Sequence, residues 1–318
     1  MQRMLIAIVL LSLAVPVTWG QTYPSKPVRL ISAFPPGGGS DAVARIIAQA
    51  LSEQMGKQMI VDSRPGANGM IGTELAARAE PDGYTLVLGN TAPIVMLTAA
   101  GTKTPYDPQK DFAPISLIAV SDYVLTVNPA LPAKSFAELV ALARSNAGKL
   151  TYASNGTMGG PHLAGELLSL LANIKLFHIP YKGNGPAAIG VMMGEATMLF
   201  GSAPSVVPHI ATGKLRGIAT TGLKRSIPDL PAITEILPGY EVNQWYGILA
   251  PTGVRKDIVA LLHKEILRAV ANPKIAQLLI HVGTQPQTST SNEFRTFIRS
   301  EIDKWTRVIK AANIRAEL

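Results

Sequence analysis

The residues with the clearest chemical potential in this sequence form a glycine-rich loop between a strand and a helix. Residues 28–34 are apolar and rich in branched side chains, which predicts a buried strand. Residues 35–39 read Pro-Pro-Gly-Gly-Gly, and a helical pattern then begins at Ser40 and Asp41 and ends at Gly56. Such a loop offers an anion unpaired backbone N–H groups and the positive end of a helix dipole. It therefore predicts an anion site, for either a dinucleotide or a carboxylate.

The same arrangement occurs a second time in the chain. Residues 150–154 predict a strand, residues 155–162 read Asn-Gly-Thr-Met-Gly-Gly-Pro-His, and a leucine-rich helix follows. Pro161 suits the first turn of that helix, where its missing N–H group is not needed. If both helix N-termini point into a shared cleft, two sets of N–H donors could hold a carboxylate without any arginine. The duplication therefore favours a binding site over two ordinary turns.

The first loop also fits a dinucleotide-binding pattern. Gly37, Gly39 and Ala42 have the spacing of that motif, and Asp62 follows where a ribose-binding acid would stand. However, the two prolines before Gly37 alter the tight turn that the motif requires. An NAD-dependent oxidoreductase that uses the Gly37–Ala42 loop is therefore the alternative hypothesis.

Sequence patterns typical of catalysis or of metal binding are absent. The five histidines show no His-x-x-x-His spacing, no Gly-x-Ser-x-Gly elbow occurs, and the sequence contains no cysteine. His162, at the start of the second helix, could contact a ligand or hydrogen-bond its own loop. We expect neither an enzyme nor a metal or cofactor site.

Composition limits the partners. The 318 residues are 47% hydrophobic and 16% charged, which predicts a large core and argues against disorder. The formal net charge is +8, but the basic residues are scattered and no dense basic run is interleaved with aromatic residues. We therefore expect a mildly cationic surface and no nucleic-acid partner.

Residues 1–20 have the pattern of a secretory signal peptide. Arg3 precedes an apolar run at residues 5–17, and cleavage is expected near Gln21. The run is shorter than the about 20 apolar residues that span a bilayer, and no cysteine is present to carry a lipid. These features predict a protein that is exported to the periplasm and is not anchored.

Alternating strand and helix patterns predict an α/β fold with two lobes. Long apolar runs at residues 115–127 and 240–250 predict extended segments that cross between the lobes. We expect lobe 1 at residues 21–122 and 246–318, and lobe 2 at residues 123–245. Each lobe would contain a mixed sheet flanked by helices, with a hinged ligand cleft between the lobes.

From Tyr23 onward the chain resembles the substrate-binding proteins of tripartite tricarboxylate transporters, the TctC or Bug family. The resemblance implies a two-lobed, type II-like periplasmic binding protein that closes on a small carboxylate and delivers it to membrane permease subunits. It leaves open whether the protein instead reports to a sensor protein, and we expect a monomer. The matching motifs, in collinear order, are Tyr23-Pro24-x-Lys26-Pro27, Phe34-Pro35-Pro36-Gly37-Gly38-x-x-Asp41, Arg64-Pro65-Gly66-Ala67-x-Gly69-x-Ile71-Gly72, Pro81-Asp82-Gly83-Tyr84-Thr85-Leu86, Tyr106-Asp107-Pro108-x-x-Asp111-Phe112 and Pro180-Tyr181-Lys182-Gly183.

The resemblance places ligand contacts on two segments, loop 1 (residues 34–41) and loop 2 (residues 154–162). Backbone N–H groups and small polar side chains would bind the carboxylate, while Phe34 and Met158 would pack against its carbon skeleton. Asp41 would accept a hydrogen bond from the ligand, although it and Ser40 could equally serve only their own helix. The expected ligand-binding residues are Phe34, Pro36, Gly37, Gly38, Gly39, Ser40, Asp41, Asn90, Ser154, Asn155, Gly156, Thr157, Met158 and His162.

Loop 2 departs from the usual pattern of the family. Met158 stands where Gly is common, Gly159 where Ser or Thr is common, and Gly201-Ser202 where an acid often occurs. A lost hydroxyl removes a donor, and methionine adds a flexible apolar surface. These differences favour a less polar or aromatic monocarboxylate over a citrate-like polyanion.

Overall fold

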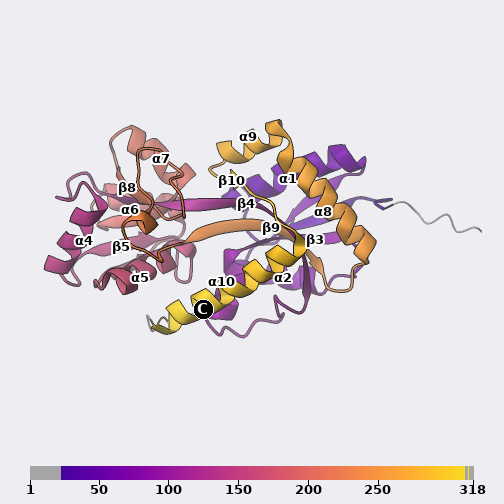
Figure 1. Ribbon diagram of the computed structural model, residues 1–318, viewed down its shortest axis with the longest axis horizontal. Helices are drawn as coiled ribbons and strands as arrows, with labels where there is room; N and C mark the ends of the chain where they lie inside the picture. The colour runs from indigo at the N-terminus through magenta and orange to yellow at the C-terminus, as the bar shows by residue number, and fades with distance from the viewer. Residues whose placement is uncertain (1–22, 312–313, 315–318) are drawn as a thin grey trace, which may run out of the picture.

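The computed structural model describes residues 23–311 and residue 314. The signal peptide expected at residues 1–20 therefore lies outside the described residues. Figure 1 shows two lobes lying along the longest axis of the molecule, with β4 (Phe112–Val127) and β9 (Asn243–Pro251) running between them. These two strands include most of both extended segments that the sequence predicted.

Lobe 1 begins with three parallel strands, β1 (Val28–Ser32), β2 (Met59–Ser63) and β3 (Thr85–Asn90). β1 lies between β2 and β3, which explains why its branched side chains are almost all buried. Helix α1 (Gly39–Met55) packs one apolar face on this sheet and on α8 (Lys256–Ala271). Further helices of this lobe include α2 (Met70–Ala77) and α9 (Pro273–His281).

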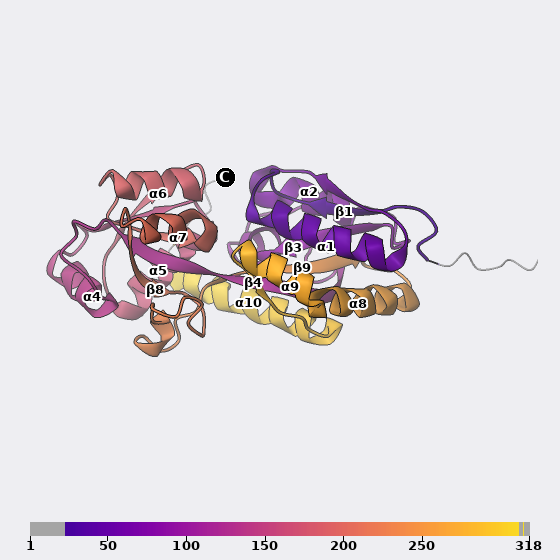
Figure 2. The ribbon, with the colours of Figure 1, turned by 90° about the horizontal axis from the view of Figure 1, so that it is seen from above.

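Lobe 2 repeats this alternation of strands and helices. Its strands β5 (Thr151–Ser154), β6 (Phe177–Pro180) and β7 (Met198–Ser202) run parallel, with β5 in the middle. Its helices are α4 (Phe136–Ser145), α5 (Gly160–Ala172), α6 (Asn184–Met192) and α7 (Ala203–Ala211). Seen from above, α6 and α7 lie in one lobe and α1 and α2 in the other (Figure 2).

Each lobe contains a mixed sheet, as expected, and the two sheets are joined through the long strand β4. The first part of β4 pairs antiparallel with β9, and its last part pairs with β7 and with β8 (Arg216–Thr220). A strand of 16 residues at about 3.3 Å per residue is long enough to serve both lobes. The strand order is β2-β1-β3-β9-β4-β7-β5-β6, with β8 and the short β10 (Gln285–Pro286) also on β4.

The C-terminal helix α10 (Ser291–Ala311) runs along both lobes (Figures 1 and 2). It packs on β4 and α3 (Leu97–Ala99) as well as on α5 of lobe 2. Its Phe294 meets the Trp245 ring edge-to-face at 5.5 Å, inside the largest hydrophobic cluster. The sequence-based division assigned residues 246–318 to lobe 1. In the structure α10, which belongs to this segment, also contacts α5 of lobe 2.

The sequence pattern missed several short elements. Residues 92–96 form a π-helix that continues into α3. Helix α7 was also missed, and it contains Pro208 in its interior. One-turn 3₁₀ helices occur at Ala67–Gly69 and Ile233–Glu235. Among the helices of the described chain, none is both long and apolar enough to cross a bilayer.

Candidate functional site

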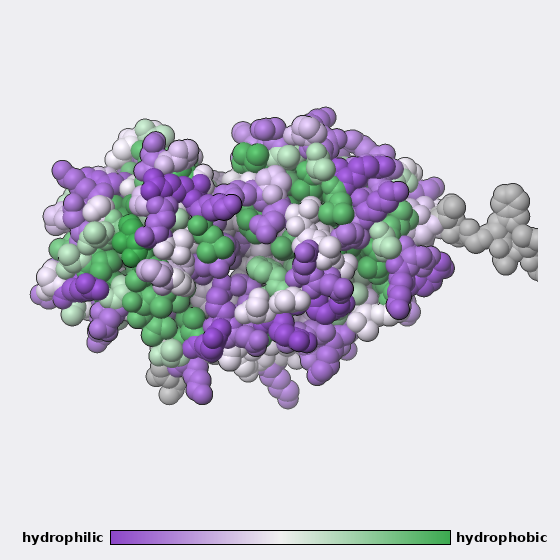
Figure 3. Space-filling view, viewed as in Figure 1, coloured by the Kyte–Doolittle hydropathy of each residue, from purple (hydrophilic) through white to green (hydrophobic). Residues whose placement is uncertain are grey.

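A cleft of about 710 Å³ lies between the lobes, and the space-filling surface is notched there (Figure 3). Both lobes and both crossing strands contribute to its walls. The lining residues are Phe34–Ser40, Asn68, Asn90, Ala92, Ser121, Tyr123, Asn155–Thr157, Gly159, Gly160, Gly183–Gly185, Ser202, Pro204, Ser205, Gln244, Tyr246, Val282 and Thr284.

Loop 1 lines the cleft with residues 34–40. Its residues 35–39 are exposed, and Gly38 is the N-cap of α1, so the first N–H groups of the helix are available. Gly37 has φ +84°, a conformation that favours glycine. A Cβ on Gly39 would stand only 3.0 Å from the Tyr246 hydroxyl, so the loop packs closely against β9.

Asp41 faces its own loop and does not line the cleft. Its Oδ2 accepts hydrogen bonds from the Gly37 N–H at 3.0 Å and from Arg45 Nε at 2.9 Å. The hydrogen bond from Arg45 lowers the pKa of the carboxyl, which is therefore ionised at neutral pH. Asp41 thus closes loop 1 on itself, which differs from the ligand contact that we expected.

Loop 2 contributes five residues to the cleft: Asn155, Gly156, Thr157, Gly159 and Gly160. Gly159 explains one departure from the family pattern, because a side chain there would overlap the Asn155 amide. Gly160 is equally restricted, since its Cβ would overlap the hydroxyl of Tyr123 on β4. The backbone of loop 2 is therefore close to its neighbours at Gly159 and Gly160, whereas Gly156 is favoured by its φ of +130°.

The other three expected residues of loop 2 do not line the cleft. Met158 is 2% exposed, belongs to the main hydrophobic cluster and has φ +62°. Ser154 and His162 are buried behind the loop. The expected contact of Met158 with a ligand is therefore corrected, because this backbone conformation turns its side chain into the core. Met158 therefore gives no support for a less polar ligand.

Two further connections of lobe 2 reach the cleft, and the sequence analysis did not assign them. Gly183–Gly185 opens α6, and Ser202–Ser205 opens α7. The sequence carried a signal for the first, since Tyr181-Lys182-Gly183-Asn184-Gly185 follows a strand as loop 2 does. Helices α1, α5, α6 and α7 therefore all begin at the cleft. Among its lining residues, all within the described chain, none carries a charged side chain.

Neutral hydrogen-bonding groups form the floor of the cleft. The Tyr123 hydroxyl donates to Gln244 Oε1 at 3.0 Å, and Asn90 Nδ2 donates to Ser40 Oγ at 3.2 Å. Asn90 is 1% exposed, and its Oδ1 has no partner in the described part of the protein. Burial raises the pKa of Tyr246 to about 12, so this phenol stays protonated at neutral pH. An anion in the cleft would meet amides, hydroxyls and helix N-termini.

Asp62, the residue that the dinucleotide hypothesis requires to bind a ribose, is paired with two arginines away from the cleft. Asp62 Oδ2 accepts hydrogen bonds from Arg29 Nε at 2.6 Å and from Arg64 Nε at 3.1 Å, and Asp62 does not line the cleft. Its carboxylate is therefore paired locally and is not placed to bind a ribose beside loop 1.

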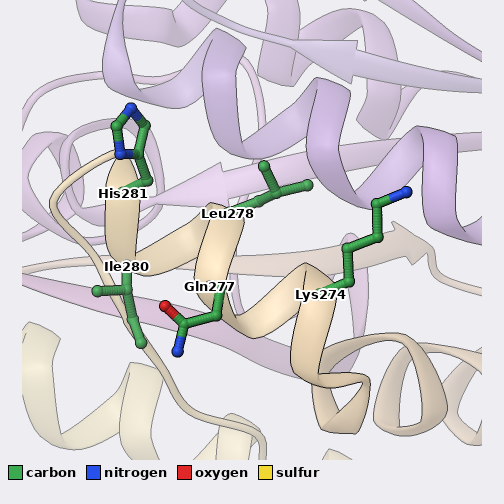
Figure 4. A pocket seen from close by; sticks show the side chains of 5 residues that line it. All are labelled: Lys274, Gln277, Leu278, Ile280 and His281. Atoms are coloured by element: carbon green, nitrogen blue, oxygen red, sulfur yellow. The ribbon is translucent and has the colours of Figure 1, made fainter.

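A second hollow lies on the surface of α9, but its residues do not converge. Lys274, Gln277, Leu278, Ile280 and His281 all come from this one helix, and Figure 4 shows their side chains pointing in different directions. Within residues 23–311, no three His, Asp or Glu side chains gather as a metal site would require. The interlobe cleft is therefore the candidate binding site.

Comparison with known proteins agrees with this architecture. Residues 43–314 match the family described as "Tripartite tricarboxylate transporter family receptor". The chain is 33% identical to protein BugT of Bordetella pertussis over 302 residues, covering 94% of this chain and 92% of BugT. The solved structure of R. palustris Rpa4515 with adipate is 30% identical, with a TM-score of 0.82 and coverage of 92% of this chain and 99% of that chain.

A further solved structure, MatC from Rhodopseudomonas palustris with bound malate, is 27% identical. Its TM-score is 0.77, and the match covers 90% of this chain and 100% of that chain. These similarities confirm the resemblance found in the sequence motifs. The chain belongs to the tripartite tricarboxylate transporter receptor family, also called the TctC or Bug family.

Proposed function

We propose that this protein captures a small carboxylate in the interlobe cleft and delivers it to the membrane permease subunits of a tripartite tricarboxylate transporter. The observation that supports this most is the meeting of four helix N-termini, those of α1, α5, α6 and α7, at a cleft without charged side chains. Helix N-termini bind anions through free N–H groups and the helix dipole.

The carboxylate would lie between loop 1 and loop 2. Backbone N–H groups of Gly38, Gly39 and Gly160 would donate to its oxygens, with added hydrogen bonds from Ser40 and Thr157. Hydrogen bonds to a charged group are each worth about 1.5–3 kcal/mol, so a few of them are enough for tight binding. Phe34 is half-buried at the rim of the cleft, where its ring can cover the carbon chain of the ligand.

We infer that the ligand class is a dicarboxylate of about the length of malate or adipate, the ligands named for two similar structures. The starts of α6 and α7 supply a second group of donors on the lobe 2 side, which a distal carboxylate could use. This proposal replaces the sequence-based hypothesis of a less polar or aromatic monocarboxylate, which depended partly on Met158.

The protein would act in the periplasm as a monomer and without catalysing a reaction. Residues 1–20 supply the export signal in this proposal, and relatives described as periplasmic binding proteins support the location. Bending of β4 and β9 between the lobes would close the cleft around the ligand. A role in reporting the carboxylate to a sensor protein is the second possibility that the sequence left open.

A thermal-shift screen of the exported chain tests this proposal. A ligand present at 100 times its Kd stabilises the native state by about 2.7 kcal/mol, which corresponds to a rise in Tm of several degrees. We expect such a rise with malate or adipate and none with NADH. A rise with NADH alone would restore the oxidoreductase hypothesis, and no rise with any carboxylate would contradict the proposed function.

A further inference from the structure

Two buried histidines stack on each other directly behind loop 2. His162 lies in the first turn of α5 and His178 lies on β6, and their ring centroids are 4.0 Å apart at an interplanar angle of 18°. The ring of Tyr152, from β5, is near both imidazoles, with its centroid 5.0 Å from that of His178 and 6.3 Å from that of His162. The arrangement thus joins three separate elements of lobe 2.

Each histidine makes one hydrogen bond to loop 2. His162 Nδ1 accepts from the Met158 N–H at 3.1 Å, and His178 Nε2 lies 2.6 Å from Ser154 Oγ. Ser154 Oγ in turn accepts from the Gly156 N–H at 3.1 Å. The pair therefore holds loop 2 at its first residue and again at the left-handed turn of Met158, on either side of Asn155, Gly156 and Thr157, which line the cleft.

We propose that His162 and His178 are positioning residues that hold loop 2 in its ligand-binding shape, and that this hold requires a neutral imidazole at His162. Protonation of His162 at Nδ1 would replace the acceptor for Met158 with a second donor, and the loop would be released. This inference rests on the proposed function of the cleft. It adds that acidification weakens carboxylate binding through residues that do not touch the ligand.

The surroundings of the pair favour neutral rings. Burial, with His178 beside it, lowers the pKa of His162 to about 3, and burial lowers the pKa of His178 to about 4. The facing titratable groups are Glu166 on α5, whose Oε1 is 3.9 Å from His162 Nε2, and Tyr152, which donates its hydroxyl to that same oxygen. Burial also raises the pKa of Glu166, and the hydrogen bond from Tyr152 opposes that shift.

The sign of the pH effect follows from these directions. A released loop would let the imidazoles return toward their ordinary pKa of about 6.5, so the released form binds more protons than the held form. The held loop is therefore fully favoured above about pH 6.5 and loses stability as the pH falls through the window between that value and the lowered pKa values.

Matched substitutions separate the effect of losing a hydrogen bond to loop 2 from the effect of protonating an imidazole. His162→Asn keeps an acceptor near the position of Nδ1 but cannot be protonated, whereas His162→Leu removes the acceptor. For the second ring, His178→Gln keeps a polar atom near Nε2, and His178→Leu removes it. The Asn and Gln variants thus test rescue by a conservative change, which loss of packing alone would not give.

Amide hydrogen exchange at Met158 and Gly156, followed by NMR without ligand, is the first readout. We expect His162→Leu to lower the protection of Met158 about tenfold at pH 7, the factor that one hydrogen bond supplies. His162→Asn should keep that protection and lose the decline that the native protein shows between pH 7 and pH 5. Unchanged protection in His162→Leu, or the native pH dependence in His162→Asn, would overturn the proposal.

Affinity for adipate and malate at pH 7 and pH 5 is the second readout. The native protein should bind more weakly at pH 5, and His162→Asn should show less of this loss. If neither compound binds at any pH, the proposed function fails while the exchange data still decide whether the histidines hold the loop. If both bind equally well at the two pH values in the native protein, the positioning role is wrong.

Discussion

The hydroxyl of Tyr123 occupies the space that the Cβ of any residue other than glycine would need at position 160. Tyr123 belongs to the crossing strand β4, and Gly160 is the first residue of α5. The crossing strand β4 therefore touches loop 2 directly. In the closure proposed above, movement of β4 would be transmitted to loop 2 through this contact.

Gly160→Ala should destabilise the protein and weaken carboxylate binding. The added methyl group would displace Tyr123 and disturb its hydrogen bond to Gln244, and overpacking of this kind costs about 1–3 kcal/mol. Denaturant unfolding and calorimetric titration would measure the two effects. Gly185→Ala is the matched control in the same cleft, because no atom lies within 4 Å of its added Cβ; equal losses in both variants would contradict this explanation.

Gly38→Leu should leave the fold intact while reducing carboxylate affinity more than tenfold. The nearest atom to a Cβ at Gly38 is the Pro35 carbonyl oxygen at 3.7 Å, an ordinary contact, so the protein tolerates the substitution. The larger side chain would cover the first N–H groups of α1, which the anion needs. Thermal unfolding and titration calorimetry check both parts, with Gly38→Ala as the smaller control. Native affinity in Gly38→Leu would exclude loop 1 as a ligand contact.

Asp41→Asn should lower stability at neutral pH, with a difference that shrinks in acid. The native carboxylate accepts hydrogen bonds from the Gly37 N–H and from Arg45. Replacing the carboxylate weakens both bonds. Because Arg45 is exposed and solvent screens its charge, we expect a total loss on the order of 1–2 kcal/mol in the free energy of unfolding. Its pKa is lowered in the folded state, so its contribution is present above pH 4 and is lost as the pH falls through the folded pKa. Unfolding curves from pH 7 to pH 2.5 would show this; a constant difference would contradict it.

Asp62→Ala should leave carboxylate binding unchanged. Asp62 pairs with Arg29 and Arg64 at a partly exposed edge, where such pairs contribute about 0–1 kcal/mol. Calorimetric titration with malate or adipate would therefore match the native protein, with only a small change in Tm. A large loss of ligand affinity would mean that the β2 end of the sheet belongs to the binding site.

The sequence predicted the alternating elements and both glycine-rich loops because those features are local. Apolar periodicity located α1 and β4, and the glycines at positions 37–39 and 159–160 marked the backbone that faces the cleft. The direction of individual side chains was beyond such patterns. Met158 turns inward because of its positive φ, which a glycine-rich sequence does not reveal for a non-glycine residue.

Long-range packing was also hidden from the sequence. The amphipathic pattern of α10 predicts a helix with one buried face, but not that the face covers both lobes. Asp41 was a reasonable ligand contact at the start of a helix, yet Arg45 one turn later draws it away from the cleft. His178 carried no motif at all and acquires a role only because β6 places it on His162.

The most direct test of the central claim is an NMR titration of the exported chain with malate and with adipate, following backbone amide shifts. A carboxylate held between loop 1 and loop 2 should shift the amides of Gly38, Gly39, Thr157 and Gly160, and those of α9 should stay in place. Shifts confined to α9, or to the β2 end of lobe 1, would contradict the account.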